Sequence, residues 1–229
     1  MLIFESPSSL LIALWLGWSG LTWMATAEDP IRFELEILAM EASDRTNPPP
    51  SGAIVLAGSS SFRLWKTLAT DLTGYPVVNR GFGGSHLSDL IFYAKRIVLP
   101  LRPRLIFVYE GDNDLASGKT PYSVFEEFRA FADLVHRKLP RTRVVFVAVK
   151  PSPQRRHLLE AQNDLNRLIR ERAGSDPQRL GYVDVVLPML TATGEPRGDL
   201  FLKDRLHLNA AGYALWTRAI REYLSANPL

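Results

Sequence analysis

Residues 54–61 read IVLAGSSS, an apolar run that ends in one glycine followed by three consecutive serines. The apolar residues are continuous rather than alternating, which is typical of a strand buried on both faces of a parallel sheet. Glycine then marks a sharp turn, and serine is a preferred N-cap residue, immediately before a helix. The stretch therefore predicts a strand, a tight turn that carries hydroxyl groups, and a helix start in immediate succession.

The alternation of apolar runs and helical stretches continues along the chain. Apolar runs predict strands at residues 53–58, 76–79, 104–111, 143–150 and 181–186. Helical spacing predicts helices at residues 31–45, 88–99, 123–139, 160–173 and 209–224. Such an order predicts an α/β domain in which helices cover both faces of a mostly parallel five-stranded sheet.

The composition limits what kind of protein this can be. The chain has 229 residues, 46% of them hydrophobic, which is enough for one sizeable core and most simply for one domain. Cysteine is absent, which excludes disulfide bonds, thiol catalysis and zinc sites with cysteine ligands. The net charge is +3, and the basic residues form no dense block. We therefore expect no nucleic-acid partner.

The first 27 residues differ from the rest. Residues 10–27 carry no charge and end in an Ala-Thr-Ala pattern that a signal peptidase could cleave before Glu28. The preceding residues contain Glu5 and no lysine or arginine, unlike a usual secretory leader. The apolar stretch is also long enough for a membrane anchor. We expect a signal peptide or anchor, followed by one exported domain over residues 28–229, periplasmic, secreted or held at a membrane.

Polar residues with reactive chemistry follow the predicted strands. In an open α/β sheet, ligands bind at the carboxyl ends of the strands, so these segments are expected to meet. They read GSSS (58–61), NRGFGGSH (79–86), EGDND (110–114), KPSPQRRH (150–157) and, before the last helix, KDRLHLN (203–209).

The serines can be interpreted in two ways. They could only cap the helix that follows. Alternatively, a serine hydroxyl becomes a nucleophile when a base takes its proton, another group orients that base and donors stabilise the oxyanion. Asp204 and His207 are three residues apart, a spacing that lets the carboxylate hold the imidazole in one tautomer. Backbone N–H groups at the glycine turn and the Asn113 amide could serve as oxyanion donors.

Four segments, GSSS, NRGFGG, GDND and DRLH, resemble in order the four blocks of the SGNH hydrolases, also called the GDSL-like lipase/acylhydrolase family. The resemblance extends over residues 54–224. It implies a flavodoxin-like three-layer α/β/α fold and a serine esterase that forms an acyl-enzyme without a metal or cofactor. By the same resemblance, the substrate is an ester of a small molecule, a polysaccharide or a lipid.

The resemblance also implies roles for individual residues. Ser60 corresponds to the nucleophile, His207 to the base and Asp204 to its orienting carboxylate. The oxyanion donors would be the backbone N–H groups of Ser60 and Gly84 and the side-chain amide of Asn113.

One residue departs from the family pattern. The family usually has aspartate before the nucleophile, whereas this chain has Ser59, so three similar serines stand in a row. We assign the nucleophile to Ser60, because a strand that ends at Gly58 and a helix that starts near Ser61 leave Ser60 exposed at the turn.

Further residues near the predicted site have less specific signals. His86, Arg155 and His157 are candidates for a substrate rim. Trp65 lies at helical spacing from Phe62 and is expected in the core rather than at a sugar-binding surface. The loops after the first three strands are short, which predicts an open pocket suited to acetyl and other short acyl groups.

Two other functions remain open from the residues alone. Asp112, Asp114, Asp204 and His207 could be ligands of a hard metal ion in a phosphoesterase. The same pocket could also bind carbohydrate or lipid without catalysis. Membrane contact is expected through the N-terminal segment only.

Overall fold

The computed structural model describes residues 29–228, so the expected signal peptide or anchor lies outside the described residues. Within them, five strands form one parallel sheet in the order β2-β1-β3-β4-β5. The strands are β1 (Ile54–Gly58), β2 (Val77–Gly81), β3 (Leu105–Tyr109), β4 (Arg143–Val147) and β5 (Leu180–Val183). The predicted five-stranded sheet is confirmed.

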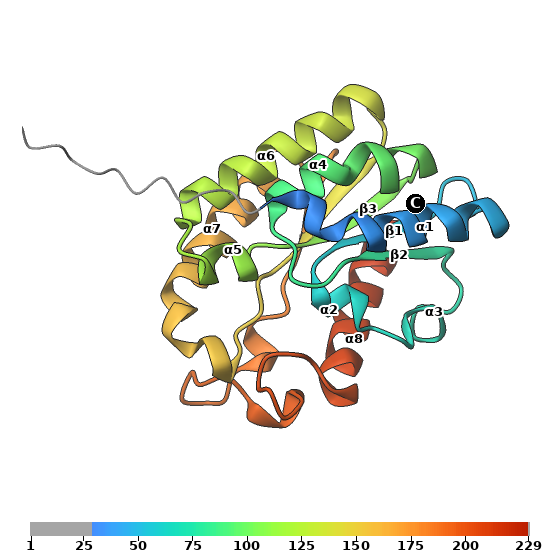
Figure 1. The fold of residues 1–229 in the computed structure, drawn as a ribbon. Coiled ribbons are helices and arrows are strands. Elements are labelled where there is room, and N and C mark those ends of the chain that lie inside the picture. Colours follow the sequence, from blue (N-terminus) through green and yellow to red (C-terminus); the bar gives the residue numbers. More distant parts are fainter. Residues whose placement is uncertain (1–28, 229) are drawn as a thin grey trace, which may run out of the picture.

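Helices cover both faces of the sheet (Figure 1). One face packs against α1, α4, α6 and α7, and the other packs against α2, α3 and α8, which confirms three layers. No helix within residues 29–228 is both long and apolar enough to cross a membrane. The helices are α1 (Glu34–Thr46), α2 (Ser60–Arg63), α3 (Leu68–Asp71), α4 (Leu87–Ile97), α5 (Asp112–Ala116), α6 (Pro121–Lys138), α7 (Leu159–Ser175) and α8 (Ala210–Ala226). Short 3₁₀ turns are η1 (Pro30–Phe33), η2 (Leu99–Leu101), η3 (Pro153–Leu158), η4 (Leu187–Met189) and η5 (Gly198–Leu200).

The interior strand β1 illustrates why a run in this sheet can be apolar at every position. Successive side chains of a strand point to opposite faces, and both faces are covered here. All five residues of β1 are buried. In register, Gly58 pairs with Gly81 of β2 and with Tyr109 of β3, so the three strands end at the same level. The loops that follow them therefore meet at one edge of the sheet.

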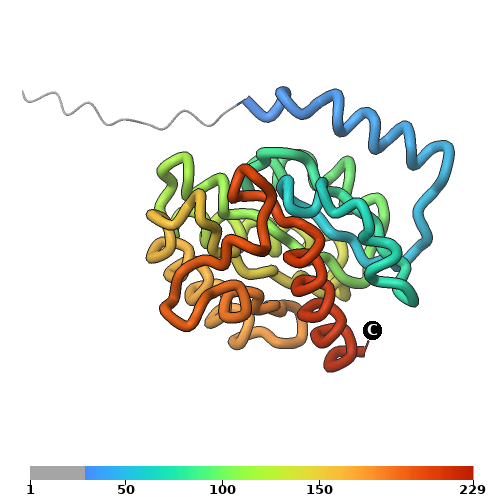
Figure 2. Tube along the Cα trace, turned by 90° about the horizontal axis from the view of Figure 1, so that it is seen from below, coloured from blue at the N-terminus to red at the C-terminus, as the bar shows by residue number. Residues whose placement is uncertain are grey.

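The first predicted helix forms, but the apolar residues with the most regular helical spacing lie on its exposed side rather than on its buried side. Ile31, Leu35 and Leu38 are 62%, 82% and 44% exposed, whereas Phe33 and Ile37 are buried. The first turn is the 3₁₀ turn η1, which has about three residues per turn and shifts the phase of the pattern. Figure 2 shows η1 and α1, in blue, along one edge of the domain, where one side of the helix faces away from the rest of the described chain.

Trp65 lies in the core, as expected. Its side chain is 1% exposed and stacks on Tyr213 with 5.1 Å between ring centroids. Its indole Nε1–H donates to Asp71 Oδ2 over 2.6 Å, so the one polar atom of the ring is satisfied.

Candidate active site

The turn after β1 presents the three serines in different environments. Gly58 has φ +140°, and a Cβ atom there would lie 2.1 Å from the carbonyl oxygen of Tyr109, so the turn requires glycine. Ser59 precedes the helix with extended backbone, and Ser60 is the first residue of α2. Ser59 and Ser61 are each only 2% exposed, whereas Ser60 is partly exposed. Of the three, Ser60 is therefore the one that a substrate can reach most easily.

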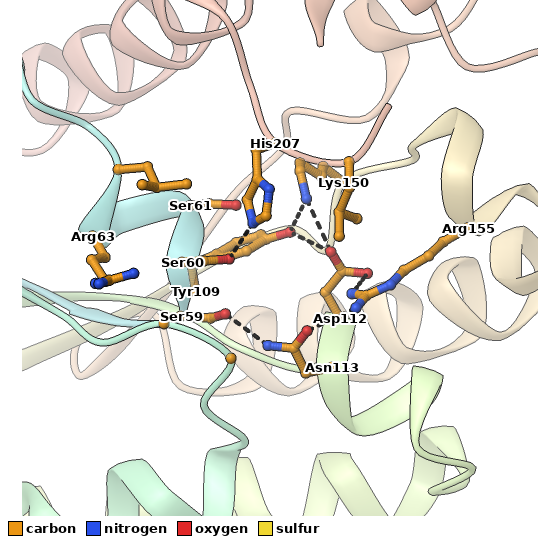
Figure 3. Close-up of a pocket in the computed structure, with 14 residues that line it drawn as sticks. Ser59, Ser60, Ser61, Arg63, Tyr109, Asp112, Asn113, Lys150, Arg155 and His207 are labelled. Carbon is orange, nitrogen blue, oxygen red and sulfur yellow. Dashed lines mark hydrogen bonds and ion pairs between the residues drawn. The ribbon is translucent and has the colours of Figure 1, made fainter. Parts of the chain in front are cut away.

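A series of hydrogen bonds joins Ser60, His207 and Asp204 (Figure 3 shows Ser60 and His207). Ser60 Oγ lies 2.9 Å from His207 Nε2, and His207 Nδ1 lies 2.6 Å from Asp204 Oδ2. Asp204 Oδ1 also accepts the backbone N–H groups of Leu206 and His207, each over 3.0 Å. The carboxylate therefore binds both the ring and the backbone of the histidine.

Asp204 accepts a hydrogen bond from the imidazole ring of His207. Partial burial acts to raise the pKa of Asp204, but the hydrogen bonds from His207 and Leu206 outweigh it and lower that pKa to about 2. An ionised carboxylate has no proton to donate, so Nδ1 of the neutral ring carries the hydrogen. Nε2 is then free to accept the hydroxyl proton of Ser60.

Gly84 and Asn113 line the same cavity as the three serines. Gly84 has φ +82° and lines the cavity next to Ser60. Asn113 Nδ2 donates to Ser59 Oγ over 2.8 Å and to the carbonyl oxygen of Ser85 over 3.0 Å. The amide of Asn113 thus points at the serine turn. To donate to an oxyanion, the NH₂ group of Asn113 must replace or share one of these two hydrogen bonds.

A buried charged cluster, formed by Tyr109, Asp112, Lys150 and Arg155, lies beside these groups and was not foreseen as a unit. Lys150 Nζ lies 3.0 Å from Asp112 Oδ2 and 3.1 Å from Tyr109 Oη, and Lys150 is 1% exposed. Arg155 Nη1 lies 2.8 Å from Asp112 Oδ1. Burial acts to raise the pKa of Asp112, but the charges of Lys150 and Arg155 outweigh it and lower that pKa. Asp112 is therefore an ionised partner of two cations.

A second buried carboxyl group supports the loop that carries Gly84. Glu110 is fully buried, and its Oε1 lies 2.6 Å from Ser85 Oγ. Ser85 Oγ also donates to the carbonyl oxygen of Phe82 over 3.0 Å. Burial, and next the charge of Asp114, raise the pKa of Glu110 well above its usual value. A protonated Glu110 can donate to Ser85 Oγ while the single hydroxyl proton of Ser85 goes to Phe82.

The cavity in front of Ser60 has a volume of about 290 Å³. Of the three rim candidates, Arg155 lines the cavity. The other two rim candidates do not line it. His86 is 8% exposed and caps α4, where its backbone N–H donates to Asp89 Oδ2, and His157 is exposed on η3.

The four residues considered as metal ligands do not converge. Asp112 binds Lys150 and Arg155, while Asp114 binds Lys119 Nζ over 2.8 Å. Across residues 29–228, no group of three or more histidine and carboxylate side chains has a geometry that could hold a metal ion.

Comparison with known proteins relates this arrangement to a family. Residues 49–215 match the model of the GDSL-like Lipase/Acylhydrolase family. No curated protein matches the sequence significantly.

Solved structures share the fold at low identity. A GDSL-like lipase from Bacteroides thetaiotaomicron has a TM-score of 0.67 and 20% identity, with 86% of this chain and 98% of that chain covered. The lipase/acylhydrolase from Enterococcus faecalis has a TM-score of 0.60 and 22% identity, with coverage of 76% and 95%. An acetyl xylan esterase has a TM-score of 0.61 and 20% identity, with coverage of 75% and 99%.

Proposed function

Because the chain belongs to the GDSL-like lipase/acylhydrolase family, we propose that it is a serine esterase that cleaves carboxylic esters through an acyl-enzyme intermediate. The observation that supports this most strongly is the hydrogen-bonded series from Ser60 Oγ through His207 to Asp204. It links an accessible hydroxyl to a base and to the carboxylate that orients the base, as nucleophilic catalysis requires.

In the first half of the proposed reaction, Ser60 Oγ attacks the carbonyl carbon of the ester while its proton passes to His207 Nε2. The π electrons of the carbonyl move to its oxygen, and the backbone N–H groups of Ser60 and Gly84 and the amide of Asn113 stabilise that oxyanion. When the carbonyl re-forms, the bond to the alcohol breaks, and the alcohol leaves with the proton from His207.

In the second half, water attacks the acyl-enzyme and gives one proton to His207. The same donors stabilise the second oxyanion. The bond to Ser60 Oγ then breaks, His207 returns the proton to Ser60, and the acid leaves. Asp204 stabilises the protonated imidazole in both halves.

The proposed acyl group is acetyl or similarly short, and the alcohol belongs to a small molecule, a polysaccharide or a lipid. A cavity of about 290 Å³ with several charged groups in its wall offers little apolar surface to a long chain. We also propose that residues 28–229 act outside the cytoplasm, because the uncharged residues 10–27 have the composition of a signal peptide or anchor.

Turnover of p-nitrophenyl esters by the purified chain tests the proposal. The chain is expected to hydrolyse the acetate ester, and Ser60→Ala should lower kcat by at least about 10⁴-fold, because the three residues act as a unit. Ser225→Ala, at an exposed serine of α8, is the control that should retain the full rate. Absence of turnover on every ester would favour a binding module, and full activity of Ser60→Ala would contradict the proposed nucleophile.

A further inference from the structure

We propose that Arg155 is a positioning residue that fixes the orientation of the Asn113 amide, and so aims one oxyanion donor at the serine turn. This proposal rests on the proposed esterase function. It assigns to Arg155 a different role from contact with the substrate at the rim.

The guanidinium of Arg155 binds two consecutive residues of α5. Its Nη2–H donates to Asn113 Oδ1 over 2.8 Å, and its Nη1 lies 2.8 Å from Asp112 Oδ1. Figure 3 shows Arg155 reaching from its own segment to both side chains. Arg155 lies on η3, after β4, so this contact joins η3 to α5 across 42 positions in the sequence.

The contact with Arg155 distinguishes the two orientations of the amide. A guanidinium has only donors, so it can face the Oδ1 atom of Asn113 but not the NH₂ group. With Oδ1 held by Arg155, the NH₂ group faces Ser59 Oγ and the carbonyl oxygen of Ser85. A rotation of the amide by 180° would place NH₂ against the guanidinium and turn an oxygen toward the developing oxyanion. Both changes are unfavourable.

Arg155 is itself held in place. Its side chain is 15% exposed, and its partner Asp112 is also bound by the buried Lys150. The next residue back, Gln154, donates its backbone N–H to the carbonyl oxygen of Arg205 over 3.1 Å, which ties η3 to the loop that carries His207. Charge-assisted contacts on both sides thus give the guanidinium one well-defined position.

The neighbouring Arg156 provides a matched control. It is also on η3, but its side chain is 65% exposed and pairs with the exposed Glu195. Removal of its charge changes the electrostatic potential near the cavity without changing any contact of Asn113.

A double-mutant cycle tests the proposal. Arg155→Met is expected to lower kcat by about 10- to 100-fold, the size of effect that follows from misplacing a catalytic group, with less than about a twofold change in KM. In the Asn113→Ala background, the same substitution should cause almost no further loss, because the group that Arg155 positions is gone. Arg156→Met should leave both constants unchanged.

Other outcomes would overturn the positioning role. If Arg155→Met raised KM and left kcat unchanged, Arg155 would contact substrate instead. If its effect multiplied fully with that of Asn113→Ala, the two residues would act independently. Should Arg155→Met fail to fold because Asp112 loses a partner, the cycle is run with Arg155→Lys, which keeps a cation there but cannot bind both side chains. Full activity of Ser60→Ala would overturn the proposed esterase function itself, whereas independence of Arg155 and Asn113 overturns the positioning role alone.

A separate observation concerns the outer side of α1. Four of the seven large apolar side chains that residues 29–228 expose lie at this edge, namely Ile31, Leu35, Leu38 and, on α4, Phe92 at 55%. Phe92 belongs to the same edge because α4 packs against α1. Its neighbours on α4 bind the start of α1, since Arg96 pairs with Glu34 over 2.8 Å.

We infer that this apolar edge rests on a lipid bilayer. Residues 10–27 are uncharged and end four positions before Ile31, so a retained N-terminal segment inserted in a membrane would hold this edge at the membrane surface. An apolar helix side next to a membrane segment can bury in the interface, which would account for its exposure among residues 29–228. The inference selects the anchor over the cleaved leader.

Site-directed spin labelling of the full chain in phosphatidylcholine vesicles tests this inference. The chain has no native cysteine, so Leu35→Cys and Leu187→Cys can each be labelled alone. Leu187 is 78% exposed and follows β5, at the opposite edge of the sheet. The label at residue 35 should be protected from a water-soluble nickel complex and accessible to oxygen, and the label at residue 187 should show the reverse. Equal access of nickel to both labels, failure of the chain to bind vesicles, or broadening between two residue-35 labels, which would indicate a second copy, would overturn the inference.

Discussion

The Nε2 atom of His207 lies 2.9 Å from the hydroxyl oxygen of Ser60, although 147 positions separate the two residues. The loop before α8 brings them together, and several backbone contacts hold that loop. Phe201 and Leu208 form an isolated β-bridge, and the N–H of Leu202 donates to the carbonyl oxygen of His207 over 2.8 Å. The proposed base is therefore positioned before substrate binds.

The pH profile tests the roles of His207 and Asp204. In the proposed mechanism only neutral His207 can accept the Ser60 proton, so kcat/KM should rise with pH on the acid side. The pKa of Asp204 is about 2, so this carboxylate stays ionised throughout the rise. Asp204→Asn removes the charge that stabilises the protonated ring. The acid limb should then move to lower pH, and the plateau rate should fall by up to about 10⁴-fold.

Asp199→Asn is the matched control for that profile. Asp199 is in the same region of the chain and is exposed like Asp204, but it pairs with Arg197 instead of a histidine. Its substitution should leave both the limb and the plateau unchanged. An acid limb that stayed in place in Asp204→Asn, with little loss of rate, would show that another group orients His207.

Removal of the Asn113 amide tests the oxyanion donors. Asn113→Ala should lower kcat by about 10²- to 10³-fold, the usual loss for one such donor, with a smaller change in KM. Steady-state kinetics on the acetate ester measure both constants. A loss confined to KM would mean that Asn113 binds substrate and transition state equally.

Incubation with EDTA tests the metal-dependent alternative. The serine mechanism requires no metal ion, so chelation should leave the rate of ester hydrolysis unchanged. If EDTA abolished turnover and a divalent cation restored it, a metal-dependent phosphoesterase would become the better interpretation.

The dependence of kcat/KM on acyl-chain length tests how much apolar surface the cavity offers. Each methylene group that moves from water to an apolar wall contributes about 0.8 kcal/mol, but only where such a wall exists. Leu64 and Leu206 are the only aliphatic side chains among the described residues that line the cavity. The value of kcat/KM should therefore be highest for acetate and fall toward laurate. A steady rise from acetate to laurate would contradict this.

The stability of Glu110→Gln at several pH values tests whether the buried Glu110 carboxyl keeps its proton in the folded protein. Because burial raises the pKa of Glu110, the folded protein keeps this proton at pH values where the unfolded chain has lost it. The free energy of unfolding should then decrease as pH rises above about 4.3, by at most about 1.4 kcal/mol per pH unit from this group. Glutamine does not titrate, so the variant should gain stability relative to the parent between pH 5 and 8. Urea unfolding at several pH values measures the difference, and a constant difference would contradict a raised pKa.

The sheet and the main helices could be predicted from the sequence because each carries a local pattern. Each of the five strands contains an apolar run, although β2 has only two apolar residues before Asn79 and Arg80, and each predicted boundary lies within a few residues of the observed one. The face of α1 could not be predicted in this way. Its orientation depends on distant partners, since Phe33 packs against Phe82 with 5.0 Å between centroids and Arg96 binds Glu41 over 2.7 Å. Spacing within the helix contains no information on such partners.

The candidate site likewise contains residues that could be predicted from a local sequence pattern and residues that could not. Ser60, Asp204 and His207 stand in short motifs, so their proximity could be expected from the strand order. The charged cluster has no such signal. Lys150 and Asp112 are 38 positions apart, and each alone looks like a polar residue at the end of a strand. Arg155 was a candidate for the substrate rim only, because its contact with Asn113 can be seen only in the fold.

Covalent modification tests the central claim most directly. The active chain is treated with a fluorophosphonate, which reacts with activated serines, and the modified peptide is located by mass spectrometry. The proposed mechanism predicts a single adduct, on Ser60, with loss of esterase activity in proportion to labelling and no adduct in Ser60→Ala. An adduct on Ser59 or Ser61, or full activity after complete labelling of Ser60, would contradict the assignment of Ser60 as the nucleophile.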